Sequence, residues 1–183
     1  MSRIAAVVAG VFLALGMVSA AEAKMVRATL PGGLARVEFD DILWKPQIGG
    51  KVLFLTCKHD DCGGARSECS LSTQKTSGQT TGDGIREALV LGMEKQLIAQ
   101  WTGYGATGMA TVEQPRHMMH GDNMGAYATF RATWKDRPTL LTFFMVPTDK
   151  FNVSATCFTA EDLGEAVWQI YGVLSGIKIG QPS

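Results

Sequence analysis

The stretch AYATFRATWKDRPTLLTFFMVPTDKFNVSATCF, residues 126–158, decides the fold of this chain. Side chains at 126–134 and 151–158 alternate between two faces, which is typical of half-buried strands. The segment between them, TLLTFFMV at 139–146, is apolar enough for a central strand. Short polar turns separate the three segments, and consecutive strands joined by short turns pair as an antiparallel meander.

The same patterns extend to both sides of this stretch. Two amphipathic helices are predicted at about 84–102 and 160–175, because apolar residues recur there at helical spacing. In the second helix, Trp168 lies beside the apolar stripe, at the helix edge. Further strands are predicted at 25–30, 34–39, 51–57, around Leu71 and at 108–114.

The two helices need a sheet to cover their apolar stripes, since neither is stable alone. The sequence therefore predicts an α+β fold. We expect a two-layer sandwich in which an antiparallel sheet of about 5–7 strands packs against both helices.

The N-terminus reads as a signal peptide. Arg3 provides a positive charge, residues 4–18 are apolar but short for a membrane span, and Ala21 and Ala23 make an A-x-A cleavage site. We expect cleavage between Ala23 and Lys24, which leaves residues 24–183 as a single α+β domain without a transmembrane segment. The mature protein should be periplasmic or secreted, from a bacterium.

Charge excludes some partner classes. The 17 basic and 17 acidic residues balance, and the basic ones form no run. Nucleic acids and anionic lipids attract clustered positive charge, so neither is expected as a partner.

All four cysteines, Cys57, Cys62, Cys69 and Cys157, lie after the predicted cleavage site. An even number in an exported chain favours two disulfides. Three pairings are open to four cysteines. Because Cys57 and Cys157 both fall on predicted strands, we favour a Cys57–Cys157 bridge across the fold and a Cys62–Cys69 bridge within a loop.

The segment CKHDDC at 57–62 admits a second interpretation. Cysteine, histidine and aspartate bind zinc when the thiols are free and deprotonated. In an exported protein, disulfides are the favoured interpretation of these cysteines.

The segment RHMMHGDNM at 116–124 concentrates histidine and methionine. Thioethers and imidazoles suit Cu(I), a soft ion. Gly121 and Asp122 are typical of a turn, so the segment should form a hairpin tip. His117 and Met119 would then share one strand face, while Met118 and His120 share the other. The candidate copper ligands are His117, Met118, Met119, His120 and Met124, with His120, Met118 and Met124 as one converging set. The alternative is that the methionines only pack beneath the hairpin.

Signatures of catalysis are absent from the sequence. It has no G-x-S-x-G elbow and no H-E-x-x-H motif, and its G-x-G-x-x-G at 103–108 follows a predicted helix, the wrong order for a dinucleotide site. We name no catalytic residue and no cofactor beyond the candidate Cu(I). Trp44 lies in an irregular stretch, either exposed as a partner contact or folded onto the core.

The order of elements resembles the Mog1/PsbP-like fold group over residues 25–179, through TLLTFFMV, FNVSATCF and the terminal helix. The resemblance implies N-terminal strands, a helix, a meander and a C-terminal helix. It also implies binding and accessory roles, often at membranes or in assembly of larger complexes. We therefore expect an exported, non-enzymatic binding or accessory protein of the periplasm. Its partner would be another exported protein or a small ligand held between sheet and helices. The alternative function is periplasmic copper handling.

Overall fold

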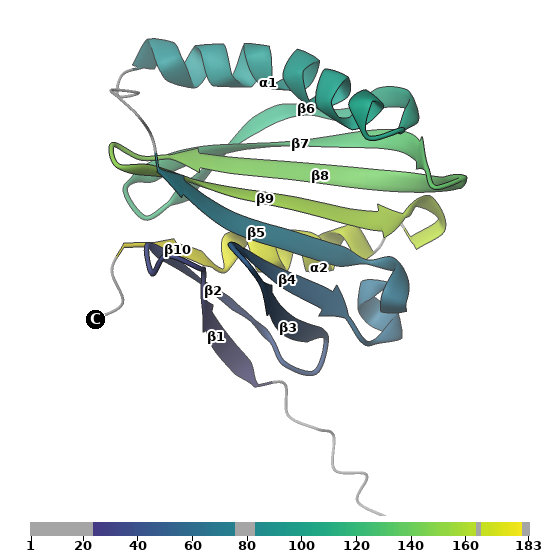
Figure 1. Cartoon of the computed structure of the whole chain (residues 1–183), viewed down its shortest axis with the longest axis horizontal. Coiled ribbons are helices and arrows are strands. Elements are labelled where there is room, and N and C mark those ends of the chain that lie inside the picture. The colour runs from purple at the N-terminus through teal and green to yellow at the C-terminus, as the bar shows by residue number, and fades with distance from the viewer. Residues whose placement is uncertain (1–23, 76–82, 164–165, 181–183) are drawn as a thin grey trace, which may run out of the picture.

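The computed structural model describes residues 24–75, 83–163 and 166–180 (Figure 1). The predicted signal peptide, residues 1–23, lies outside this part of the chain. The described strands form two sheets, and every pairing in them is antiparallel.

A seven-stranded sheet forms the centre of the molecule, in the order β3-β4-β5-β9-β8-β7-β6. The predicted meander is confirmed, because the three strands of residues 126–158 pair side by side with short turns between them. The strands are β3 (Trp44–Gly49), β4 (Val52–Cys57), β5 (Glu68–Lys75), β6 (Thr107–His120), β7 (Asn123–Trp134), β8 (Arg137–Pro147) and β9 (Phe151–Ala160).

A smaller, three-stranded sheet has the order β1-β2-β10. It consists of β1 (Met25–Thr29), β2 (Ala35–Asp40) and β10 (Ile177–Ile179). Helix α2 (Ala166–Ser175) leads directly into β10. Gly176 makes this connection, and its carbonyl accepts a hydrogen bond from the Glu38 backbone N–H at 2.9 Å. A Cβ atom on Gly176 would lie 2.1 Å from the Glu38 carbonyl oxygen, so the contact requires glycine.

Helix α1 (Asp83–Gly103) covers one face of the central sheet, on the side of β6 and β7 (Figure 1). The sheet presents small residues there: Ala126, Ala128 and Ala132 of β7 are buried on this side. Leu97 of α1 belongs to the same hydrophobic cluster. Short side chains on the strand allow the helix to pack close to the sheet.

The opposite face of the central sheet carries the larger core. Helix α2 and the small sheet pack on it, and Ile170, Leu174 and Val37 are fully buried against Phe144 and Leu71. The α+β class is confirmed, but the expected two-layer arrangement is wrong. The helices lie on opposite faces of the central sheet, so the molecule has three layers (Figure 1).

The first helix spans the predicted range, whereas the second begins later than expected. Strand β9 continues to Ala160 and is followed by a 3-10 turn, η3 (Glu161–Leu163), before α2 starts at Ala166. Thr159 does not cap the helix: it is fully buried in β9, where its hydroxyl hydrogen-bonds that of Ser67.

Candidate functional site

The cysteine loop forms a structural staple. Two disulfides join Cys57 to Cys62 and Cys69 to Cys157, so the predicted Cys57–Cys157 and Cys62–Cys69 pairing is wrong. The reason lies in the strand register: Cys69 of β5 is the direct cross-strand partner of Cys157 of β9, with Cα atoms 4.0 Å apart. No free thiol remains for zinc.

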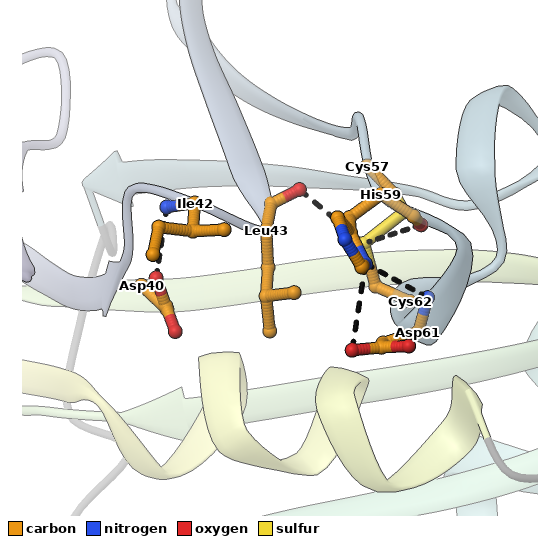
Figure 2. Close-up of polar contacts among 7 residues, drawn as sticks. All are labelled: Asp40, Ile42, Leu43, Cys57, His59, Asp61 and Cys62. Carbon is orange, nitrogen blue, oxygen red and sulfur yellow. Dashed lines mark hydrogen bonds and ion pairs between the residues drawn. A yellow bond between two sulfur atoms is a disulfide. The ribbon is translucent and has the colours of Figure 1, made fainter. Parts of the chain in front are cut away.

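His59 organises the loop between the first two cysteines (Figure 2). It caps a 3-10 turn, η1 (Asp60–Cys62), and its Nδ1 accepts a hydrogen bond from the Asp61 backbone N–H at 3.2 Å. The Asp61 carboxylate lies 3.4 Å from the same nitrogen. Figure 2 shows this loop lying against α2. A second 3-10 turn, η2 (Gly64–Arg66), follows, and the loop then enters β5.

Across the described ranges, no group of three or more His, Cys, Asp or Glu side chains is placed to hold a metal ion.

The histidine and methionine segment forms the tip of the β6–β7 hairpin, as predicted. Met118 packs against the core on the α2 side, and His120 lies on that side too, in ring contact with Phe144. Met119 pairs directly with Met124 across the hairpin, on the α1 side. The five candidate ligands are therefore divided between two faces, and the set of His120, Met118 and Met124 does not converge.

His120 is buried, with 5% of its surface exposed. Its Nδ1 lies 3.1 Å from the Ile177 carbonyl oxygen of β10. Because a carbonyl only accepts, Nδ1 carries the proton. Nε2 is buried without a hydrogen-bond partner among the described residues. Burial therefore lowers the pKa of His120 below its ordinary value of 6.5. The neutral ring ties the hairpin tip to the small sheet.

Three aromatic rings of α2 and β7 form a row at the surface, in which the middle ring, Tyr171, contacts the other two. Tyr171 makes edge contacts with Tyr127, at a centroid distance of 5.4 Å, and with Trp168, at 5.8 Å. Trp168 is 71% exposed, the largest exposed fraction among the big hydrophobic side chains described. Arg116 of β6 is the cross-strand partner of Tyr127. We call these four residues the aromatic surface.

A chain of hydrogen bonds fixes Tyr171. Its hydroxyl donates to Glu113 of β6 at 2.5 Å and lies 3.3 Å from the Thr129 hydroxyl, which is therefore the donor to it. Thr129 is in turn 3.2 Å from the hydroxyl of Thr142. Glu113 also pairs with Arg116 at 3.2 Å. The network thus holds both a tyrosine and an arginine of the aromatic surface in place.

Tyr171 is a hydrogen-bond donor rather than a proton-transfer group. Burial, together with its hydrogen bond to Glu113, raises the pKa of Tyr171 to about 12. A general acid or base works best with a pKa near the operating pH, and this phenol is far from it. The network therefore supports binding better than proton transfer.

Among the described residues, surface recesses also lie away from the aromatic surface. One, of about 900 Å³, is lined by the β1–β2 turn, the β3–β4 turn and the end of β5, with Lys51 and Lys75 at its border. Another, of about 350 Å³, lies at the β7–β8 turn beside Trp134 and Arg137. Neither recess is lined by a histidine and a carboxylate together.

Comparison with known proteins identifies the fold. No family model and no curated protein sequence matches the chain. Solved structures do match: the Ran-binding protein Mog1p of Saccharomyces cerevisiae superposes with a TM-score of 0.58 at 8% identity, covering 87% of this chain and 97% of that one. Cyanobacterial PsbP (CyanoP) of Synechocystis gives 0.59 at 10% identity, over 88% and 95%. LpqN of Mycobacterium tuberculosis, involved in cell envelope biogenesis, gives 0.59 at 6% identity, over 85% and 91%.

The chain has the Mog1/PsbP-like fold. The resemblance seen in the order of its elements is therefore confirmed at the level of structure. At such low identity the similarity shows the fold alone, so no residue role is transferred from these proteins. None of the described helices is long and apolar enough to cross a membrane.

Proposed function

We propose that this protein is an exported, non-enzymatic accessory protein that binds another exported protein through the aromatic surface. The observation that carries this proposal is the exposure of Trp168 beside Tyr171, whose hydroxyl is held by Glu113 and Thr129. Tryptophan, tyrosine and arginine are the residues that dominate binding energy at protein interfaces. Here all three kinds lie together.

Preorganisation strengthens the case. Most side chains lose rotamer freedom on binding, at roughly 0.5–1.5 kcal/mol each for the flexible ones. Tyr171 is already fixed by Glu113 and Thr129, and Arg116 by Glu113. A partner would therefore have less of this surface to order on binding, because two of its four side chains already have polar partners within the fold.

Export is supported by the cysteines and by the structural neighbours. Disulfides persist in oxidising compartments, and both bridges here are buried. LpqN, which shares the fold, is involved in cell envelope biogenesis, and Mog1p binds the protein Ran. Both structural similarities are compatible with a protein partner outside the cytoplasm, and they support this proposal only at the level of fold.

Site-specific photo-crosslinking in the native compartment tests the proposal. A photoreactive phenylalanine analogue replaces Trp168 in one variant and Ile48 in a matched control. Ile48 is 64% exposed on β3, at the opposite edge of the central sheet from β6. We expect one discrete protein adduct from position 168 and none from position 48.

A second arm uses the partner identified in that adduct. Arg116→Ala should weaken its binding by about tenfold or more, as expected at an interface hot spot. No adduct from position 168, equal labelling from both positions, or unchanged affinity of the partner for Arg116→Ala would contradict the proposed binding surface.

A further inference from the structure

A group of soft-ligand side chains surrounds Ala126 on the α1 side of the central sheet. His117 of β6 and Met145 of β8 are its direct partners on either side. Met124 lies two positions before Ala126 on the same face of β7, and Met119 of β6 pairs directly with Met124. Three neighbouring strands thus present one imidazole and three thioethers on one face.

Sheet geometry places each of the other three groups beside Met124 of the middle strand. Directly opposite residues such as Met119 and Met124 have Cβ atoms about 4.5–5.5 Å apart, and diagonal neighbours about 7–8 Å. His117 is diagonal to Met124, and so is Met145. Methionine has three rotatable bonds and a flexible arm, so the sulfur atoms can close these gaps. Ala126, with its single methyl group, fills little of the space between them.

Exposure separates this group from ordinary core packing. Met119 is 58% exposed and His117 is exposed, while Met124 and Met145 are half-buried. A group with two half-buried methionines and two exposed donors offers ligands together with a path of entry. These four residues share a face only because of the strand register, since Met145 is 21 positions beyond Met124 in sequence.

We infer that His117, Met119, Met124 and Met145 form a binding site for a soft monovalent metal ion, Cu(I) in the exported protein. Imidazole and thioether are ligands suited to Cu(I), and carboxylate or water ligands that suit hard cations are not among the four. All four cysteines are held in disulfides, so thiolates do not compete for the ion. The site is separate from the aromatic surface, which lies on the α2 side.

The other face of the hairpin provides an internal control. Met118 is adjacent to Met119 in sequence but packs against the α2-side core, and His120 is occupied at Nδ1 by the Ile177 carbonyl. A site made by this face, or by the sequence composition alone, would depend on Met118 as much as on Met119.

Competition for Cu(I) against a chromophoric chelator, with the disulfides intact, tests the inference. The wild type should bind one equivalent, Met119→Leu/Met124→Leu should bind about tenfold more weakly or worse, and Met118→Leu should match the wild type within about twofold. Methionine to leucine nearly conserves volume, so the fold should persist, and thermal unfolding checks this.

A second measurement on the wild type needs no variant. Silver(I), a soft ion of the same charge, is added to protein with labelled methionine methyl groups. The resonances of Met119, Met124 and Met145 should shift, and that of Met118 should not. Absence of competition by the wild type, equal weakening by Met118→Leu, or shifts centred on Met118 would overturn the inference.

Discussion

Replacing Cys69 and Cys157 together by alanine should destabilise the protein about twice as much as replacing Cys57 and Cys62 together. The two bridges close loops of very different length, with sequence separations of 88 and 5 residues. A longer loop loses more conformational entropy in the unfolded chain when it is closed.

The chain-entropy relation gives the magnitude. A loop of 88 residues corresponds to about 4.6 kcal/mol at 25 °C and one of 5 residues to about 2 kcal/mol. All four cysteines are buried, at 0–2% exposure, so the small cavities left by alanine are similar and largely cancel in the comparison. The expected difference between the two variants is therefore about 2.5 kcal/mol in the free energy of unfolding.

Urea denaturation measures this difference, which corresponds to a gap of about 1 M between the two midpoints for ordinary m-values. Thiol titration accompanies it. With the pairing seen in the structure, each double variant keeps its other bridge and has no free thiol. The Cys57–Cys157 and Cys62–Cys69 pairing would instead leave two free thiols in each variant. Two free thiols would contradict the pairing, and equal midpoints would contradict the dependence on loop length.

Three further predictions concern single positions. Burial lowers the pKa of His120 below 6.5, so the folded state binds a proton at this site less readily than the unfolded chain does. The neutral, buried His120 ring therefore contributes fully to the free energy of unfolding above pH 6.5, and this contribution is lost as the pH falls through the folded-state pKa. Thermal unfolding between pH 7.5 and 5.5 should therefore shift less in His120→Gln than in the wild type, and equal shifts would argue against it. Tyr171→Phe removes the donor to a carboxylate and should cost roughly 1.5–3 kcal/mol in urea denaturation, whereas an unchanged midpoint would mean that the hydrogen-bond chain contributes nothing. Lys135 and Asp136 form the β7–β8 turn with φ of 50° and 60°, so Lys135→Asn/Asp136→Gly should stabilise the protein by about 1–2 kcal/mol, raising its melting temperature; a lower melting temperature would contradict this.

The elements that could be predicted from sequence are the ones with long, regular patterns. Helix α1 and strands β7, β8 and β9 each carry a clear period. Strand β3 was missed because it is an edge strand whose sequence, WKPQIG, includes a lysine and a proline and buries only Trp44. Trp44 itself is 2% exposed, so it belongs to the core and is not a partner contact.

Features that depend on long-range pairing lie beyond such patterns. Strand β10 has three residues and exists because it pairs with β2, about 140 positions earlier. The same pairing creates the third layer, which a count of helices and strands does not indicate. The start of α2 was misplaced because Thr159 and Ala160 resemble a helix cap locally, while β8 holds them in the sheet.

The candidate sites, too, have a part that follows from the local sequence pattern and a part that depends on long-range pairing. Alternation along 117–120 correctly separates Met118 and His120 from His117 and Met119, since it needs only the period of a strand. The alternation does not show which face Met124 occupies. Only the β7–β8 register shows that Met145 lies on the same face as the other three residues. The sequence places Trp168 at the helix edge, three positions before Tyr171. The hydrogen bond from Tyr171 to Glu113 joins residues 58 positions apart, so no local pattern indicates it.

The mass of the natural protein, measured intact and without reduction, tests the central claim that this is an exported, disulfide-bonded module. We expect a chain that begins at Lys24 and is four hydrogens lighter than its fully reduced form, as two disulfides require. A chain beginning at Met1 or Ser2, with all four cysteines open to alkylation, would contradict it.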